Sequence, residues 1–386
     1  MTFGRSDYGL LRNLVLELSN TEKLDPILVI AGSHFLEKFG KSVDEIHRDA
    51  FTEVVEINCI SGSSEASDVV QDMSNSLSEI GKVLKSIEPD LVVLLGDRFE
   101  TLMAASACLI LGVPIAHING GELTLGSFDD SIRHSITKMS TIHFVANEEY
   151  KNRVLQLGEE MARVHNVGHL GADSFGNLTP MSRQELEKKL KYKFQSQNFL
   201  VTIHPETSSS TSAQNLVDTI LSALESFPEV GIIFTHPNPD PGHAEIANAI
   251  EEFSSKRENS IFLQSMGHEA YLSAMLQCDV VVGNSSSGVL EAPLAGIPSV
   301  DIGSRQSGRS LTKMVTNCDV DRDEIQKALE QLLIASPDEE VSQSRDLLGD
   351  SVSRKITKII SNLDTVEVQQ KSFQDMTITT GAGRIV

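Results

Sequence analysis

Short apolar runs alternate with amphipathic helical stretches along most of this chain, and this alternation limits its fold more than any other feature. The runs are almost entirely apolar, as in Leu91–Leu95 and Phe199–Ile203, and lack the alternation of a half-buried strand. Continuous apolar strands joined by helices are typical of parallel sheets that helices cover on both faces. The sequence therefore predicts an α/β protein.

The predicted elements follow from this pattern. Strands are expected at Ile27–Ala31, Val54–Ile60, Leu91–Leu95, Pro114–Ile118, Ile142–Ala146, Phe199–Ile203, Gly231–Thr235, Ser260–Leu263, Asp279–Val282 and Ser299–Ile302. The main helices are expected at Leu10–Ser19, Ser67–Ile87, Arg98–Leu111, Asp130–Met139, Ala213–Phe227 and Asp321–Ile334. A chain of 386 residues is too long for one ordinary core and suits two domains.

The pattern divides into two blocks, which a polar, lysine-rich helix at Ser182–Lys193 joins. We expect an N-terminal domain at residues 1–174, together with a returning helix at about residues 351–363, and a C-terminal domain at residues 175–350. Residues 364–386 are polar and weakly patterned, which predicts a flexible tail. Two doubly wound sheets that face each other form a cleft at the carboxyl ends of their strands.

The formal net charge of −22 limits the partners of this protein. Nucleic acid and anionic membranes attract basic surfaces, so we exclude both as main partners. The sequence has no apolar run near the ~20 residues that cross a bilayer, and its first residues are not typical of a signal peptide. Its four cysteines lie far apart, which indicates reduced thiols. We therefore expect a cytoplasmic protein.

Acidic side chains follow two neighbouring strands and begin the next helix. Asp97 comes directly after Leu91–Leu95, Glu122 follows the next strand, and Asp129 and Asp130 open the predicted helix. Several carboxylates in one cleft destabilise one another, so they suit acid–base chemistry with separated pKa values better than a structural role. These four residues are the candidate catalytic groups.

The same helix also has a purely structural interpretation. Asp129 is well placed to cap it, and the pairs Asp129–Arg133 and Asp130–His134 each share one helix face. Caps and surface ion pairs are common. The convergence of the carboxylates favours the chemical interpretation. An anionic small ligand would need a locally positive pocket, and Arg133 is one of the candidate cations for it.

A run of small polar residues follows the predicted strand Asp279–Val282 and precedes a helix. Amides and hydroxyls at such a helix start bind phosphate, which makes Ser285 and Ser286 candidates. Glu291, further along, lies within reach of ribose hydroxyls. An ordinary serine N-cap explains one such residue, but several in a row favour a phosphate site.

Supporting side chains also stand directly after strands. His204 and His236 each end a strand, Asn238 follows His236, and Arg305 and Arg309 follow the last strand. A single histidine here is more often structural than catalytic. The spacing of the histidines does not match a metal-ligand pair, and no Gly-x-Gly-x-x-Gly follows a strand, so the sequence predicts neither a metal nor another cofactor.

At these residues the chain strongly resembles the UDP-N-acetylglucosamine 2-epimerase family, in its hydrolysing branch from sialic and legionaminic acid pathways. The resemblance covers nearly the whole chain except about the last 20 residues, where the pattern is lost. The motifs that carry it are Arg5-Ser6-Asp7-Tyr8-Gly9, Gly96-Asp97-Arg98, His117-Ile118-Asn119-Gly120-Gly121-Glu122, Asp129-Asp130-Ser131-Ile132-Arg133-His134, Gly283-Asn284-Ser285-Ser286 and Gly303-Ser304-Arg305-Gln306.

The resemblance implies a GT-B-like fold, in which two Rossmann-type domains face a central cleft and the last helix returns to the first domain. It implies a UDP-sugar substrate and a homo-oligomer, either a homodimer or a homotetramer. It also implies a reaction in two steps. UDP is eliminated across C1–C2 to give a 2-acetamidoglycal, and water is then added to give the free 2-epimerised sugar.

The resemblance also assigns residues. Asp97 and Asp129 match catalytic acids of the family. The positions that match nucleotide contacts are Arg5, Arg98, His204, Asn238, Ser285, Ser286, Glu291 and Arg305. Some members have glutamate where this chain has Asn119, so either Glu122 takes that role or the neutral amide marks a different sugar.

Several functions are compatible with these residues. The first is conversion of UDP-N-acetylglucosamine and water to N-acetylmannosamine and UDP. The second is the same chemistry on UDP-2,4-diacetamido-2,4,6-trideoxy-glucose. A GT-B glycosyltransferase would not need so many carboxylates, and a nucleotide-sugar sensor without turnover would lose them.

Overall fold

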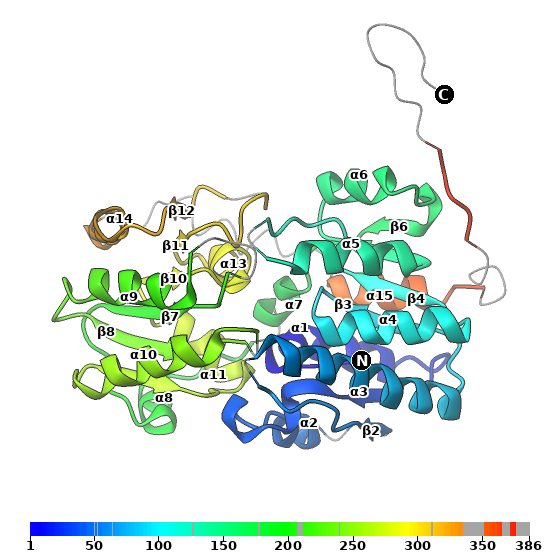
Figure 1. The fold of residues 1–386 in the computed structure, drawn as a ribbon, viewed down its shortest axis with the longest axis horizontal. Helices are drawn as coiled ribbons and strands as arrows, with labels where there is room; N and C mark the ends of the chain where they lie inside the picture. The colour runs from blue at the N-terminus through cyan, green and yellow to red at the C-terminus, as the bar shows by residue number, and fades with distance from the viewer. Residues whose placement is uncertain are drawn as a thin grey trace, which may run out of the picture.

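The protein is described here from a computed structural model. The structure describes residues 1–49, 51, 53–63, 65–125, 127–176, 178–206, 211–238, 240–309, 312–334, 351–364 and 371–375. Figure 1 shows two groups of elements side by side. We call the group before residue 177, with the last helix, the N-terminal half, and the group at residues 183–334 the C-terminal half.

The N-terminal half contains two parallel sheets. The larger has the order β3-β4-β5-β6, with β3 (Val92–Leu95), β4 (Ile115–Ile118), β5 (Ile142–Val145) and β6 (Val164–Asn166). The smaller pairs β1 (Leu28–Ile30) with β2 (Val54–Glu56). The first residues connect the two sheets, because Thr2 forms a parallel bridge with Ile30 and the amino group of Met1 donates to the Val93 carbonyl at 3.0 Å.

Helices cover both faces of these sheets. The helices are α1 (Arg5–Ser19), α2 (Val43–Arg48), α3 (Ala66–Ile87), α4 (Phe99–Leu111), α5 (Asp129–Met139), α6 (Glu148–Gln156), α7 (Gly171–Gly176) and the returning α15 (Val352–Ile360), with short 3-10 turns at Gly32–Phe35, Glu37–Phe39 and Met161–Arg163. One core joins α3 and α4 to β3, through residues such as Ile80 and Cys108. Another core joins α1 and α15 to β4 and β5, through residues such as Leu14 and Ile356.

The C-terminal half is built on a six-stranded parallel sheet in the order β12-β11-β10-β7-β8-β9. Its strands are β7 (Asn198–Thr202), β8 (Gly231–Thr235), β9 (Ser260–Leu263), β10 (Val280–Gly283), β11 (Ser299–Ile302) and β12 (Val315–Cys318). Its helices are α8 (Arg183–Leu190), α9 (Ala213–Leu224), α10 (His243–Ser255), α11 (His268–Met275), α12 (Ser286–Val289), α13 (Glu291–Ala295) and α14 (Arg322–Ile334). Separate cores lie on its two faces.

The buried strands were predictable because each contains a continuous apolar run. Every residue of β7, β8 and β10 is buried. Two strands at sheet edges, β6 and β12, were not predicted, because their sequences, Val-His-Asn and Val-Thr-Asn-Cys, contain no apolar run. Helix α1 begins at Arg5 and not at Leu10, and Gly9 within it lies so close to His268 that an added Cβ would be 2.5 Å from the ring nitrogen.

The boundary expected at residue 174 stays a prediction, and it falls within α7. This helix contacts α1 and α15 in the N-terminal half and α13 in the C-terminal half. The tail at 364–386 is described only at residues 364 and 371–375. There, Lys371 pairs with Glu159 at 2.8 Å and the Gln374 amide donates to the Gly158 carbonyl at 2.9 Å, so this stretch is docked.

Two further observations concern the cysteines and the apolar length of the helices. The four cysteines are buried and unpaired. Among the residues that the structure describes, no helix is both long and apolar enough to cross a membrane.

Candidate active site

A cleft between the two halves collects the residues that follow the strands of both large sheets. All of the expected site residues except Asp130 and His236 line it. The carboxylates come from the loops after β3 and β4 and from the start of α5, whereas the serines and Arg305 follow β10 and β11. The arrangement places acids on one wall and phosphate-type donors on the other, as the carboxyl ends of parallel strands lead us to expect.

Arg133 organises the acidic wall. Its side chain is 1% exposed, one guanidinium nitrogen contacts the Asp97 carboxylate, and the other donates to the Glu122 carbonyl at 3.0 Å. The structural interpretation of this helix, with Arg133 paired to Asp129, does not hold, because the aspartates that Arg133 meets are Asp97 and, at 3.7 Å, Asp130. A buried arginine needs such partners to offset the loss of water.

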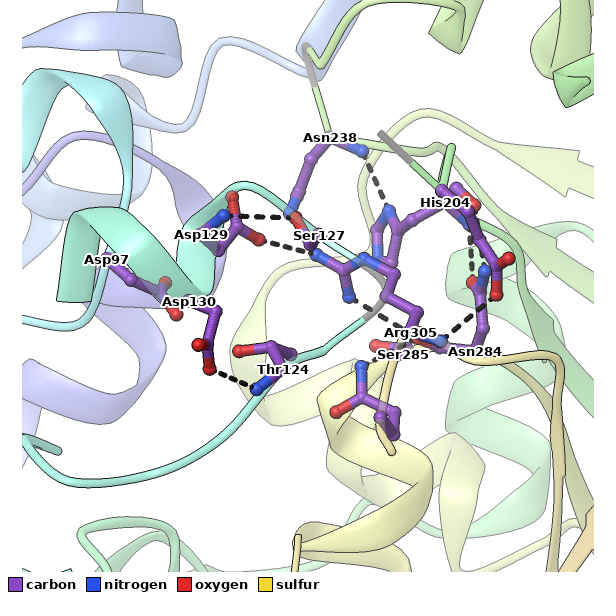
Figure 2. Close-up of polar contacts among 12 residues, drawn as sticks. Asp97, Thr124, Ser127, Asp129, Asp130, His204, Asn238, Asn284, Ser285 and Arg305 are labelled. Carbon is purple, nitrogen blue, oxygen red and sulfur yellow. Dashed lines mark hydrogen bonds and ion pairs between the residues drawn. The ribbon is translucent and has the colours of Figure 1, made fainter. Parts of the chain in front are cut away.

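Asp129 does not cap the helix that it begins. It is the first residue of α5, and Phe128 occupies the N-cap position. Its carboxylate instead accepts from Arg305 at 3.3 Å across the cleft, as Figure 2 shows. Burial raises the pKa of Asp129 and nearby Asp240 raises it further, while Arg305 lowers it. These opposing effects suit a group that exchanges a proton.

Asp130 lies beside the cleft and not in its described wall. Its carboxylate accepts from the Thr124 amide at 2.7 Å (Figure 2). The His134 ring lies 3.6 Å from the same carboxylate, so these i,i+4 neighbours meet on the helix face that they share. The bond to Thr124 holds the loop that carries Glu122 onto α5.

Glu122 forms an ion pair with an arginine from the opposite half. Its carboxylate lies 2.9 Å from Arg309, and the two side chains are 1% and 7% exposed. Burial raises the pKa of Glu122, and Arg309 lowers it. The second carboxylate oxygen of Glu122 is buried and has no hydrogen-bond partner among the described residues.

Asn119 also lines the cleft, and its backbone is left-handed. Its φ is +65°, in the left-handed region that asparagine adopts more readily than glutamate. Its neutral amide therefore stands in the wall near the carboxylates, three residues before Glu122.

On the opposite wall, His204 is fixed by two asparagines. The His204 amide donates to the Asn284 side chain at 2.7 Å, and the Asn238 amide donates to the His204 ring at 3.1 Å (Figure 2). The ring accepts at Nδ1, so the neutral tautomer carries its proton on Nε2. Burial, with Arg305 as a further cause, lowers the pKa of His204, which favours this neutral form.

The serine turn forms the start of α12. Ser285 is the N-cap and its hydroxyl accepts from the Ser287 amide at 3.3 Å. Ser286 is the first helical residue, and the Ser287 hydroxyl meets Tyr271 at 2.5 Å. Glu291 begins the next helix, α13, and lines the same cleft. The ordinary cap and the candidate phosphate site therefore coincide in one turn.

Arg305 stands where the two walls meet. Besides its contact with Asp129, it donates to the Asn284 carbonyl at 3.3 Å. Glu206 anchors its loop, because the amides of Ser304 and Arg305 donate to the Glu206 carboxylate at 2.7 and 3.0 Å. The Nε atom of Arg305 is buried and unpartnered among the described residues, which leaves a donor for a ligand.

Three other expected ligand-binding residues have protein partners. His236 stacks on Phe262 and packs against Phe39, away from the main cleft. Arg5 donates to the carbonyls of Gln264 and His236, and so connects α1 to the C-terminal half. Arg98 lines the cleft, but its guanidinium lies against Glu100 at 3.2 Å.

Sequence reasoning did not assign several polar residues that line this cleft, among them Asp240, Tyr271 and His169. His169 follows β6, an unpredicted strand, and its Nε2 atom is buried without a partner among the described residues. Recognising Val164–Asn166 as a strand would have found it by the same strand-end rule. The sequence indicated Arg309 only as a second cation after the last predicted strand. Its pairing with Glu122 was not predictable, because the two residues lie far apart in the sequence.

The family profile described as "UDP-N-acetylglucosamine 2-epimerase" matches residues 16–361. The chain belongs to the UDP-N-acetylglucosamine 2-epimerase family. Relatives in this family include "GDP/UDP-N,N'-diacetylbacillosamine 2-epimerase (hydrolyzing)" of Campylobacter jejuni, 36% identical over 329 residues that cover 85% of each chain. Another is the "UDP-N-acetylglucosamine 2-epimerase" of Neisseria meningitidis serogroup B, 30% identical over 380 residues and 98% of each chain.

Solved structures of the family show the fold. The crystal structure of UDP-GlcNAc 2-epimerase from Neisseria meningitidis bound to UDP-GlcNAc superposes with a TM-score of 0.73 and 16% identity. The match covers 93% of this chain and 98% of that chain. The expected α/β, GT-B-like architecture, with two Rossmann-type sheets facing a central cleft, is confirmed.

Proposed function

We propose that this family member is a hydrolysing 2-epimerase, which converts UDP-N-acetylglucosamine and water to N-acetylmannosamine and UDP. The observation that carries the proposal is that the two walls of the cleft hold different kinds of side chain. Carboxylates of the N-terminal half face the serine turn and Arg305 of the C-terminal half. Acid–base groups therefore stand opposite donors suited to a diphosphate.

In the first step, a carboxylate removes the proton at C2 of the sugar. The electron pair of the C2–H bond forms a C1=C2 double bond, and the bond from C1 to the diphosphate oxygen breaks. UDP and a 2-acetamidoglycal result. The C2 proton is weakly acidic, so a base must be positioned beside it, and the charge that develops on the diphosphate must be stabilised.

In the second step, water supplies its oxygen to C1 and a proton is delivered to C2. The proton enters on the face opposite to the one that lost it, so the product is the free sugar with inverted C2. We assign the C2 proton transfers to Asp97, Glu122 and Asp129. Asp130 positions the loop of Glu122 through Thr124.

The second substrate candidate is UDP-2,4-diacetamido-2,4,6-trideoxy-glucose. The name of the Campylobacter relative, whose match covers 85% of this chain, supports it. Asn119 supports it too, because the amide offers a neutral donor and acceptor where some members have a carboxylate. Both candidates use the same chemistry at C1 and C2.

Incubation with each UDP-sugar tests the proposal. We expect UDP and free 2-epimerised sugar to appear in equal amounts. Both products are measured by NMR during the reaction, and the Asp97→Asn protein serves as the blank. Release of UDP only in the presence of a sugar acceptor would instead identify a glycosyltransferase. UDP-sugar binding without release would identify a sensor, and either result would overturn the proposal.

A further inference from the structure

The loop that follows β11 carries a charge from the C-terminal half into the acidic wall of the other half. Arg309, in this loop, places its guanidinium 2.9 Å from Glu122. Neither side chain is more than 7% exposed. An ion pair this well buried is held in one geometry, because a charge that loses its partner there is strongly destabilised.

Backbone contacts hold this loop against the loop of Glu122. The Leu125 amide donates to the Ser307 carbonyl at 3.2 Å. Gly308 has a φ of +90°, and a Cβ added there would lie 2.7 Å from the Leu123 side chain. The close approach therefore requires glycine directly before Arg309, both for its backbone conformation and for its lack of a side chain.

The other charged or titratable groups around Glu122 come from the neighbouring elements, and they are Asp97, Asp129 with its partner Arg305, Asp130, Arg133, Arg153 and His169. Arg133 and Arg153 donate to backbone carbonyls, of Glu122 and Gly121 respectively. Among the described residues, Arg309 is the cation that pairs with the Glu122 carboxylate itself.

We propose that Arg309 is a positioning residue, which orients the Glu122 carboxylate in the cleft and supplies its counter-charge from the opposite half of the molecule. With one oxygen held by Arg309, the buried and unpartnered second oxygen is the one that can serve the sugar. The inference rests on the proposed function, because Glu122 is an acid–base candidate only within it.

The arrangement links the two halves chemically. Arg305 and Arg309 lie on the same loop and pair with Asp129 and Glu122 respectively. When this loop is docked, both carboxylates have a cationic neighbour. When the halves separate, Glu122 loses Arg309. The proton affinity of Glu122 therefore depends on how the halves are arranged.

The test measures the pKa of Glu122 directly in UDP-saturated protein. The carboxyl carbon of Glu122 is observed by ¹³C NMR with labelled glutamate, and its resonance is assigned by its loss in Glu122→Gln. Removing an opposite charge at this distance shifts a carboxyl pKa by about 1–3 units. We therefore expect Arg309→Met to raise the pKa of Glu122 by that amount, and Arg309→Lys to raise it less.

Glu291 is an internal control, because it lines the same cleft but Ser287, and not Arg309, is its hydrogen-bonding neighbour. Its titration should not change. If Arg309→Met fails to fold, Arg309→Gln removes the same charge and keeps a polar side chain. An unchanged Glu122 pKa in the folded neutral variant would overturn the inference.

Turnover provides a second readout. In the pH profile of kcat/KM, the limb that reports the titration of Glu122 should move to higher pH in Arg309→Met. The pKa from NMR should rise in the same variant. A uniform loss of activity with unmoved limbs would contradict a positioning role. If the wild-type protein turns over no UDP-sugar, the proposed function fails, while the NMR titration still decides the role of Arg309.

Discussion

At the scale of single residues, the site is a set of buried charges that find partners across long sequence distances. Asp129 pairs with Arg305 and Glu122 with Arg309, and each pair joins the two halves. The sequence predicted which residues gather, because they follow strands. It did not predict the pairs, since spacing along one helix favoured Asp129 with Arg133, and tertiary packing placed Arg133 on Asp97 instead.

The carboxylates of Asp97 and Asp129 should be needed for turnover and not for nucleotide binding. Asp97→Asn and Asp129→Asn keep the side-chain shape but remove the proton acceptor. We expect kcat to fall by about 100-fold or more in each, the usual scale for an acid–base group. UDP affinity by calorimetry should change little. Asp323→Asn, at a highly exposed position, is the control. Full activity in either variant would remove that residue from the mechanism.

Asp301 makes a separate prediction about pH and stability. Burial raises the pKa of Asp301 to about 7, although Arg309 and Arg305 oppose this effect. Between about pH 4 and pH 7, the unfolded chain has released this proton and the folded protein retains it. The free energy of unfolding therefore falls as pH rises through this window. One pKa unit corresponds to about 1.4 kcal/mol.

Asp301→Asn cannot titrate, so it should lack this fall. Between pH 5 and pH 8 we expect its free energy of unfolding to drop less than that of the wild type, by about 2–3 kcal/mol, from denaturant titrations. Asp323→Asn should behave as the wild type does. Parallel pH profiles for Asp301→Asn and the wild type would show that Asp301 titrates normally.

At the scale of elements, the sequence predicted the strands that contain an apolar run, including the edge strand β9, and missed two that do not. Strands such as β7 and β10 contain a continuous apolar run, so their pattern is sufficient. The edge strands β6 and β12 carry polar residues in place of such a run, so they lack that pattern. Missing β6 also hid His169. The loop after β11 has no periodic signal at all, and its position depends on contacts with the other half.

That loop should be sensitive to a single methyl group. Gly308→Ala adds a Cβ 2.7 Å from Leu123 in a left-handed backbone, which must push the loop away from the N-terminal half. A displacement of ~1 Å at a site costs on the order of 100-fold in rate, so we expect kcat/KM to fall by at least about tenfold.

The matched control for this variant is Gly112→Ala. Gly112 also has a positive φ, +73°, but no atom lies within 4 Å of an added Cβ. Both variants carry a backbone strain of about 1–2 kcal/mol, and only Gly308→Ala adds the collision. Equal kinetics in the two variants would show that the approach of the loop to Leu123 has no role in catalysis.

At the scale of the whole molecule, function depends on two halves that each hold part of the chemistry. Contacts between them include Arg5 with Gln264, the His268 amide with Glu45 at 3.0 Å and the Leu125 amide with the Ser307 carbonyl at 3.2 Å. Sequence alternation predicted two facing sheets, and the strand-end rule predicted their shared cleft. The relative placement of the halves was not predictable, because it depends on packing between loops distant in sequence.

The central claim is elimination followed by hydration, and isotope incorporation tests it most directly. The reaction is run on the UDP-sugar that is turned over, once in heavy water and once in ¹⁸O-labelled water, and the free sugar is analysed by NMR and mass spectrometry. We predict deuterium at C2 and solvent oxygen at C1, because C2 loses its proton and water supplies the new hydroxyl. A product that retains protium at C2 in heavy water would contradict the account and indicate simple hydrolysis without epimerisation.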